Sequence, residues 1–305
     1  ALLDPGDEVL IEEPAYDPIV ALAESLGARV RRFPRRAGNA WRIDPADVAV
    51  ALSPATRLVV LSNLHNPTGA LYATVAGTIA RVPARIRTEH SVHYPGRHSG
   101  LYTHVLEPVL TAASGRVICV CEAVRRSHAD RLSRFREKFV VVANGISARA
   151  GGRTRDSVRA ELGLAPDARV VLPVGSLTRQ KAQHDLTEAF GRGVRDRAGA
   201  TLLIAGDGPL RAPLETLARD RGVAERVRLL GARQDVGDLI AAADVFVLSS
   251  IREGLSVTLL EAMRAGRPAI VTDVGGNREA VEHGVTGLMV PSGDQGALGE
   301  AIGAL

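Results

Sequence analysis

The chain has 305 residues, of which 46% are hydrophobic, and it carries a formal net charge of +4 with a pI near 9.5. This composition excludes a disordered chain and suffices for one large or two medium-sized hydrophobic cores. Aromatic residues make up only 3% and arginines are spread over both halves, so the positive charge does not indicate nucleic-acid binding.

Short apolar runs alternate with amphipathic segments from residue 8 onward, a pattern that predicts an α/β fold with parallel strands joined by helices. The expected strands are 8–11, 58–61, 85–88, 117–120, 139–142, 170–173, 201–204, 245–248 and 269–272. The expected helices are 19–26, 122–135, 184–190, 209–220, 257–265 and 277–282.

Two changes in sequence character predict domain boundaries. One lies near residues 70–78, and the other is a Gly- and Arg-rich stretch at 148–154 that is typical of a linker. We therefore expect three segments, 1–72, 73–148 and 149–305. The chain does not begin with Met and its last residues fall within an expected helix, so we expect a piece of a longer protein.

The two cysteines, Cys119 and Cys121, alternate within an apolar run, so we expect both on one side of a strand as reduced core residues, not as metal ligands. No run of eighteen apolar residues and no signal-peptide pattern is present, which favours a cytoplasmic location. Three arginine pairs leave open a peripheral contact with the anionic inner face of a membrane, although solvated arginines are the favoured interpretation. The pairs are Arg31 and Arg32, Arg35 and Arg36, and Arg125 and Arg126.

The most informative run extends from Ser249 to Pro268 and contains two glutamates, Glu253 and Glu261. A strand, a turn at Gly254 and a helix that opens at Ser256 follow one another here. The free N–H groups and positive end of that helix point toward the turn, which favours diphosphate binding, and a glycine lets a ligand approach the backbone closely. The run resembles the donor-binding half of GT-B glycosyltransferases of family 4, a resemblance that covers residues 73–305.

The resemblance implies Rossmann-like parallel sheets, with a GT-B-type C-terminal domain and an incomplete or replaced N-terminal domain. It implies a retaining transfer from a UDP-, GDP- or ADP-sugar to a saccharide or lipid-linked acceptor, with no metal or other cofactor required. In the family the first glutamate faces donor-sugar hydroxyls and the second accepts from both ribose hydroxyls, roles that fall on Glu253 and Glu261. Gly254, Leu255 and Ser256 are expected to line the donor.

A second segment, Val174 to Lys181, resembles the phosphate-binding loop of the same family. Gly175 opens the turn and Lys181 matches the family's phosphate-binding lysine. The family usually has arginine directly after the glycine, where this chain has Ser176, and Arg179 is the expected substitute. Two cations would neutralise the departing diphosphate, which itself accepts the proton of the acceptor.

His90 aligns with a histidine at the end of an N-terminal-domain strand that reaches the donor sugar in the resembling family, so it is a further catalytic candidate. His93 and His98 are spaced too irregularly to indicate a metal site. Asn144 and Gly145 resemble the family's hinge dipeptide.

Residues 1–72 resemble a different class of enzyme, the class I/II pyridoxal-phosphate aminotransferases. The resemblance rests on Glu-Glu-Pro-Ala-Tyr at 12–16 and His-Asn-Pro-Thr-Gly at 65–69. It implies that Tyr16 stacks on the cofactor and that Asn66 bonds its phenolic oxygen.

An aminotransferase also needs a lysine for the Schiff base with its cofactor. The only two lysines of the chain, Lys138 and Lys181, lie outside an aminotransferase-like context. Pyridoxal phosphate is therefore not expected, and glycosyl transfer is the leading hypothesis. The alternatives are a catalytically incomplete aminotransferase-like protein and a noncatalytic nucleotide-binding chimera.

Overall fold

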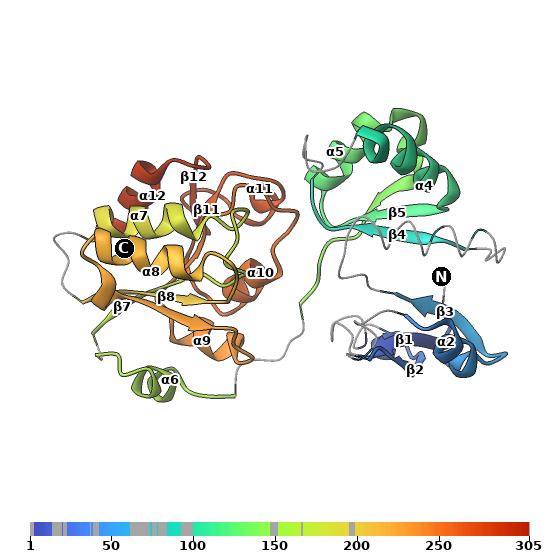
Figure 1. Cartoon of the computed structure of the whole chain (residues 1–305), viewed down its shortest axis with the longest axis horizontal. Helices are drawn as coiled ribbons and strands as arrows, with labels where there is room; N and C mark the ends of the chain where they lie inside the picture. Colours follow the sequence, from blue (N-terminus) through green and yellow to red (C-terminus); the bar gives the residue numbers. More distant parts are fainter. Residues whose placement is uncertain are drawn as a thin grey trace. The chain divides into compact units, whose positions relative to one another are not determined.

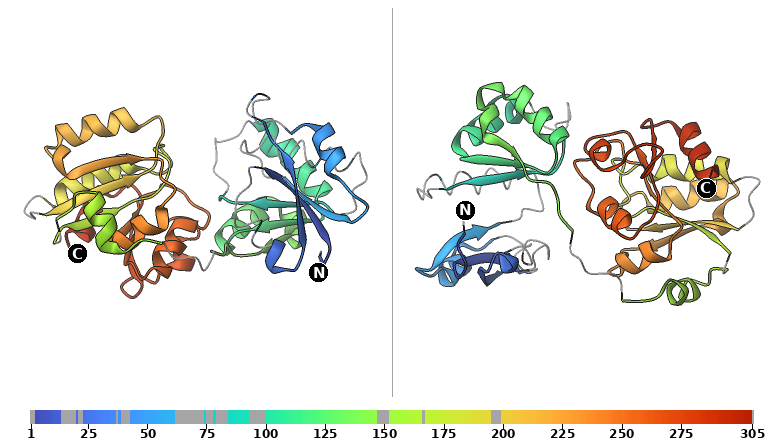
Figure 2. Two further views of the ribbon diagram at one scale, coloured as in Figure 1. Left: turned by 90° about the horizontal axis from the view of Figure 1, so that it is seen from below. Right: turned by 180° about the vertical axis from the view of Figure 1, so that it is seen from behind.

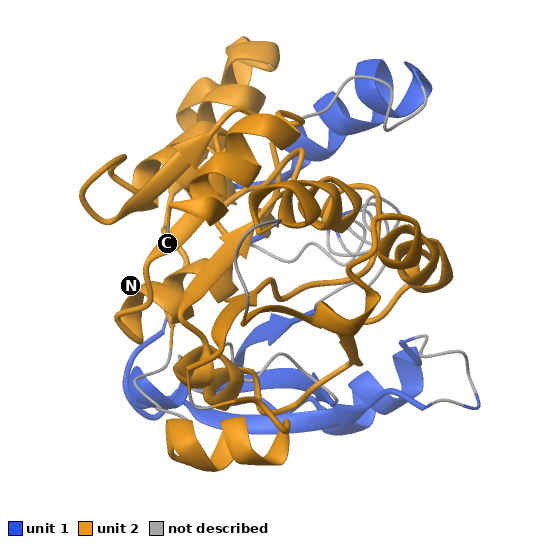
Figure 3. Ribbon diagram, turned by 90° about the vertical axis from the view of Figure 1, so that its left-hand side faces the viewer, with its two compact units in different colours: residues 1–85, 100–115 blue, residues 86–99, 116–305 orange. Residues whose placement is uncertain are grey.

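The computed structural model of the chain (Figure 1) is divided into two compact units, which Figure 3 shows in different colours. Unit 1 comprises residues 1–85 and 100–115, and unit 2 comprises residues 86–99 and 116–305. The structure describes residues 3–13, 20, 23–36, 38, 43–61, 74, 78, 84–92, 100–146, 152–165, 167–194 and 199–304. Each unit is described by itself below.

Unit 1 contains a parallel sheet in the order β2-β1-β3. Its strands are β1 (Glu8–Glu13), β2 (Arg29–Pro34) and β3 (Thr56–Val60), and its helices are α2 (Pro45–Ala51), a π-helix (Tyr102–Leu106) and α4 (Glu107–Ala113). The central strand β1 buries side chains on both faces: Val9 and Ile11 pack in one cluster and Leu10 packs with Phe33 in the other. Asp44 caps α2 by accepting from the Ala46 N–H.

The arginines around β2 are not all solvated, which corrects the sequence interpretation. Arg35 is 9% exposed, and its Nε lies 2.7 Å from Oε2 of Glu12, itself 2% exposed. Arg31 fits the expectation better, with a 44% exposed side chain and a longer contact of 3.7 Å to Glu8. A buried guanidinium requires a buried carboxylate, so Arg35 belongs to the interior of unit 1.

Unit 2 contains two parallel sheets, and the smaller one has the order β4-β5-β6. Its elements are β4 (Ile86–Glu89), β5 (Arg116–Cys119), α5 (Glu122–Arg131), a 3-10 helix (Ser133–Lys138) and β6 (Phe139–Val141). Cys119 and Cys121 are free and buried in its core, as expected, and burial raises the pKa of the Cys119 thiol to about 12. The expected helix 122–135 ends early because Leu132 leaves helical geometry, with φ −109° and ψ 47°.

The larger sheet of unit 2 has six parallel strands in the order β12-β11-β10-β7-β8-β9. The strands are β7 (Arg169–Leu172), β8 (Ala200–Ala205), β9 (Val227–Gly231), β10 (Val245–Leu248), β11 (Ala269–Thr272) and β12 (Gly287–Val290). The helices are α6 (Arg155–Glu161), α7 (Gln183–Gly193), α8 (Arg211–Asp220), a 3-10 turn (Ala224–Arg226), α9 (Val236–Ala242), α10 (Val257–Arg264), α11 (Asn277–Ala280) and α12 (Gln295–Gly303). Figure 2 shows helices on both sides of this sheet.

Alternating side chains of the strands feed two hydrophobic clusters, one on each face of the larger sheet. Val247 of β10 packs in the cluster of α7, α8 and α12, whereas Phe246 and Leu248 pack in the cluster of α6, α9 and α10. A strand buried on both faces needs a nearly continuous apolar run, and such runs predict β7, β8, β10 and β11 correctly. The structure confirms the expected α/β class.

Asp244 fastens α6 to the larger sheet. Its carboxylate accepts hydrogen bonds from the Val170 N–H at 2.7 Å and from Arg155, and it forms an ion pair with Arg159 at 3.4 Å. Burial raises the pKa of Asp244, but the Val170 N–H and the two guanidinium groups outweigh burial and hold it below its usual value. The carboxylate therefore joins a helix and the start of β7 across more than 70 positions of sequence.

Two remaining expectations concern helices. Of the helix expected at 19–26, the structure describes residues 20 and 23–25 as helical. No helix within the described ranges has the length and hydropathy needed to cross a membrane.

Candidate active site

The turn after β10 is the centre of the candidate site. β10 is buried along its whole length, and α10 begins after Ser256, whose Oγ accepts from the Leu259 N–H at 3.4 Å. The cap satisfies one of the first free N–H groups of the helix, while the others remain at the turn. This local structure agrees with the strand, turn and helix expected from the sequence.

Glu253 and Lys181 meet in this turn although they are 72 positions apart. Nζ of Lys181 donates to Oε1 of Glu253 at 2.7 Å, and the Ser250 hydroxyl donates to the same oxygen at 2.6 Å. The Glu253 side chain is 8% exposed and that of Lys181 is 22% exposed. The pair is thus a nearly buried carboxylate with an ammonium group that water still reaches.

The loop that carries Lys181 is joined to the turn by backbone and side-chain contacts. The Ile251 N–H donates to the Gln180 carbonyl at 2.9 Å, and the Ser249 hydroxyl donates to the Lys181 carbonyl at 2.9 Å. At the start of this loop, Gly175 has a φ of +155°. Two segments from distant parts of the sequence therefore form one unit around the ion pair.

Arg179 and Ser176 are exposed on the same loop. Within the described residues Arg179 has no hydrogen-bond or ion-pair partner, and the structure does not bring it to Glu253 as it brings Lys181. The Ser176 carbonyl accepts from the Gln183 side chain at 3.0 Å. Arg179 is therefore an exposed cation in the loop that precedes α7, which begins at Gln183.

Gly254 lies in a space that no larger residue fits. A Cβ at this position would lie 2.1 Å from the His90 carbonyl oxygen and 3.1 Å from a methyl group of Val120. On another side, the Gly276 N–H donates to the Gly254 carbonyl at 2.6 Å. The end of β4 and the loop before α11 thus both pack against the glycine turn.

His90 reaches the site mainly through its backbone. The residue is exposed, although desolvation by neighbouring protein groups lowers the pKa of its ring, with Glu89 opposing the shift. This shift favours the neutral form of the ring. His93 and His98 lie outside the described residues, and within those residues no group of three potential ligands is arranged to hold a metal ion.

Glu261 lies on α10, five positions beyond the cap at Ser256, and is half-buried. Burial raises its pKa, and Arg264 partly opposes the shift. No described side chain donates a hydrogen bond to its carboxylate. A carboxylate that is desolvated yet lacks a protein donor has its acceptor capacity free for a ligand.

Sequence reasoning missed three groups that organise the site. Ser249 and Ser250 are the two described above, and the third is Glu279 of α11. Its two carboxylate oxygens accept from the N–H groups of Glu122 and Ala123 at 2.8 and 2.7 Å, which caps α5. Two adjacent serines directly after a buried strand are the signal that could have indicated the first two.

Leu255 and Asn144 are in contact, although their sequence motifs are 111 positions apart. Nδ2 of Asn144 donates to the Leu255 carbonyl at 2.8 Å. The segment that resembles a hinge is thus tied to the glycine turn. Arg125 and Arg126 are both paired with Glu122, and the hydrogen bond from Arg125 does most to lower the pKa of that carboxyl to about 2.

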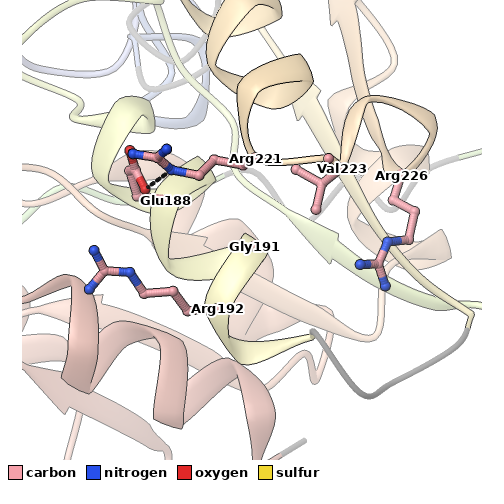
Figure 4. Close-up of a pocket in the computed structure, with 7 residues that line it drawn as sticks. Glu188, Gly191, Arg192, Arg221, Val223 and Arg226 are labelled. Atoms are coloured by element: carbon pink, nitrogen blue, oxygen red, sulfur yellow. Dashed lines mark hydrogen bonds and ion pairs between the residues drawn. The ribbon is translucent and has the colours of Figure 1, made fainter.

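A pocket of about 480 Å³ lies beside the C-terminal half of α7, whereas Lys181 precedes the N-terminus of that helix (Figure 4). Arg221 donates two hydrogen bonds of 2.6 Å to the Glu188 carboxylate, while Arg192 and Arg226 lie on opposite sides of the pocket. The three guanidinium groups do not converge on a common point. None of the residues that line this pocket belongs to the glycine turn after β10.

Comparison with known families gives two matches, one at each end of the chain. A family model described as glycosyl transferases group 1 matches residues 168–305, and one described as aminotransferase class I and II matches residues 1–75. Tyr16 and Asn66, the expected cofactor contacts of the second segment, lie outside the described residues.

Three curated relatives illustrate the similarity. An uncharacterized glycosyltransferase of Methanocaldococcus jannaschii is 32% identical over 70% of this chain and 57% of its own length. The lipopolysaccharide core biosynthesis glycosyltransferase LpsE of Rhizobium meliloti is 36% identical over 56% of this chain and 55% of its own length. An alpha-maltose-1-phosphate synthase of Mycobacterium tuberculosis is 30% identical over 89% of this chain and 79% of its own length. The chain thus spans little more than half of the first two relatives.

Two solved structures are similar in fold. Anabaena Alr3699/HepE, crystallised with UDP and glucose, has a TM-score of 0.75 at 21% identity, and the similarity covers 97% of this chain and 89% of that one. WaaG, a glycosyltransferase involved in lipopolysaccharide biosynthesis, has a TM-score of 0.70 at 20% identity and covers 97% and 90%.

Proposed function

Because this chain belongs to the group 1 glycosyltransferases and has a GT-B fold, we propose that it transfers a sugar from a nucleoside diphosphate sugar to an acceptor hydroxyl. The observation that carries the proposal is the nearly buried pair of Lys181 and Glu253 beside the N-terminus of α10. We assign the chain to family 4 of these enzymes and propose transfer with retention at the anomeric carbon.

The proposed donor lies across the glycine turn. The Lys181 ammonium binds the diphosphate, where negative charge develops as the glycosidic bond breaks, and the open N–H groups of α10 assist it. Arg179, an exposed cation without a described partner, is the proposed second neutralising group. The ion pair of Lys181 with the donor phosphate thus replaces part of its ion pair with Glu253.

Two carboxylates bind the hydroxyls of the donor. Glu253 is proposed to accept from sugar hydroxyls, and Glu261, which no described side chain satisfies, to accept from both ribose hydroxyls. His90 is proposed to contact the sugar from the end of β4. Positioning and charge stabilisation then account for catalysis, and the diphosphate accepts the proton of the acceptor.

For the nucleotide and the acceptor we propose uridine diphosphate and a saccharide. The HepE structures named for UDP and UDP-glucose support the first choice, and a relative named for lipopolysaccharide core biosynthesis supports the second. The segment at 1–75 is not proposed to catalyse transamination, because it contains no lysine for the Schiff base with the cofactor, and both lysines of the chain, Lys138 and Lys181, lie outside it.

Calorimetric titration of the whole chain with UDP, GDP, ADP and pyridoxal phosphate tests the proposal. We expect saturable binding of one nucleotide, UDP first, and no binding of pyridoxal phosphate. Lys181→Met should weaken nucleotide binding by about 10- to 100-fold, the effect of losing a charged hydrogen bond. Arg192→Met, which removes an exposed cation at the other end of α7, is the matched control and should bind as the parent chain does. Binding of none of the three nucleotides would refute the proposal.

A further inference from the structure

One residue of the phosphate-binding loop has an unusual backbone conformation. Ala182 has φ 49° and ψ 39°, and among the described residues it is the one non-glycine residue with a positive φ. Alanine rarely adopts this left-handed region, because its Cβ crowds the following carbonyl group. Ala182 directly follows Lys181 and directly precedes α7, so the direction of the lysine depends on this strained turn.

The Ser249 hydroxyl lies where it can hold the turn. It donates to the Lys181 carbonyl at 2.9 Å and to the Ala182 carbonyl at 3.1 Å, and Ser249 is 3% exposed. One hydroxyl hydrogen is shared between the two acceptors, a three-centre arrangement that fixes both peptide groups. The Thr178 carbonyl accepts from the N–H groups of both residues, at 3.1 and 3.3 Å, so the turn is fixed from two sides.

The next residue along the chain holds the other member of the ion pair. The Ser250 hydroxyl donates to Glu253, and Thr272 of β11 donates to the Ser250 carbonyl at 2.6 Å. The end of β10 thus supplies one hydroxyl to the lysine loop and one to the glutamate. Strand β10 is buried and paired on both sides, so it forms a rigid base for both contacts.

We propose that Ser249 is a positioning residue for donor binding, which holds the left-handed turn at Ala182 and thereby aims Lys181 at the diphosphate. This inference rests on the proposed function, because it takes Lys181 to be the phosphate ligand. The strain at Ala182 is balanced in the protein before the donor arrives, so binding does not have to order the loop.

The test is a double-mutant cycle of Ser249→Ala and Ala182→Gly in the whole chain. Glycine adopts the left-handed region without strain, so it should rescue a turn that has lost its serine. We expect Ser249→Ala to weaken UDP binding about tenfold and the double variant to bind within about threefold of Ala182→Gly alone. Thermal unfolding of the same four proteins should show the same coupling.

Thr187→Val is the matched control, because it removes another buried hydroxyl, which donates to the Gln183 carbonyl at 2.9 Å. Its effect should simply add to that of Ala182→Gly. Unchanged UDP binding by Ser249→Ala, or a loss that Ala182→Gly does not restore, would overturn the inference. If the parent chain binds no nucleotide, the proposed function fails, and additive thermal shifts in the cycle would separately show that Ser249 does not hold the turn.

Discussion

Replacing Lys181 with methionine leaves the Glu253 carboxylate inside the protein with the Ser250 hydroxyl as its remaining described donor. Methionine keeps most of the apolar stem of the lysine, so the loss is mainly that of the charge. Removing one partner of a buried ion pair costs about 3–5 kcal/mol. Because the Lys181 side chain is 22% exposed, water replaces part of the lost interaction, and we expect about 2 kcal/mol.

A second substitution tests the origin of this loss. Glu253→Gln in the Lys181→Met background removes the uncompensated charge, so the double variant should be more stable than Lys181→Met alone, with a coupling of about 1–2 kcal/mol. A loss of 2 kcal/mol corresponds to a lower unfolding temperature by about 4–8 °C in a domain of this size. Thermal unfolding followed by circular dichroism measures all four proteins. If the change in unfolding temperature of the double variant equals the sum of the changes in Lys181→Met and Glu253→Gln, the two residues are not energetically coupled and the argument is refuted.

Three further predictions concern other parts of the site and its support. Burial raises the Glu261 pKa, so the folded state holds this proton more tightly than the unfolded state does. The free energy of unfolding should therefore fall as pH rises through the range just above the ordinary glutamate pKa. Glu261→Gln should abolish that fall, which urea unfolding at a series of pH values measures. Nucleotide affinity, which needs the ionised carboxylate, should instead be lost as pH decreases through the same range, and a calorimetric profile identical to that of Glu261→Gln would contradict the ribose assignment. Gly254→Ala should destabilise the protein by about 2 kcal/mol or more through its clash with His90, whereas Gly152→Ala, with open space around it, should not lower the unfolding temperature. Asp244→Ala should cost about 2–4 kcal/mol because Arg155 and Arg159 lose their carboxylate and keep only backbone carbonyls as described partners, and a denaturation midpoint equal to that of the parent chain would exclude this anchoring role.

The sequence predicts the buried strands far better than the edge strands, for a physical reason. The three strands that its patterns do not indicate, β2, β9 and β12, each lie at the edge of a sheet. An edge strand needs less apolar surface, and β2 has a single fully buried side chain, Phe33, among several arginines. Continuous apolar runs therefore reveal every central strand of these sheets but only three of the six edge strands, β3, β4 and β6.

The candidate site shows the same limit at the level of side chains. The motifs predict Lys181 and Glu253 as separate site residues, but they do not predict the hydrogen bond between them. That bond joins residues 72 positions apart and forms because β7 and β10 are neighbours in the sheet. The contact of Ser249 with the lysine loop and that of Glu279 with α5 are likewise products of tertiary packing. No local pattern encodes the left-handed conformation of Ala182, because alanine is among the residues least expected there.

The cap that Glu279 places on α5 makes two backbone amides into reporters of the integrity of unit 2. The N–H groups of Glu122 and Ala123 stand in the first turn of α5, where a helix offers no carbonyl partner of its own. Their protection against exchange with deuterated water therefore depends on a carboxylate more than 150 positions away. Deuterium uptake at these two amides would thus record how often α11 leaves α5, separately from the exchange of the amides within the body of the helix.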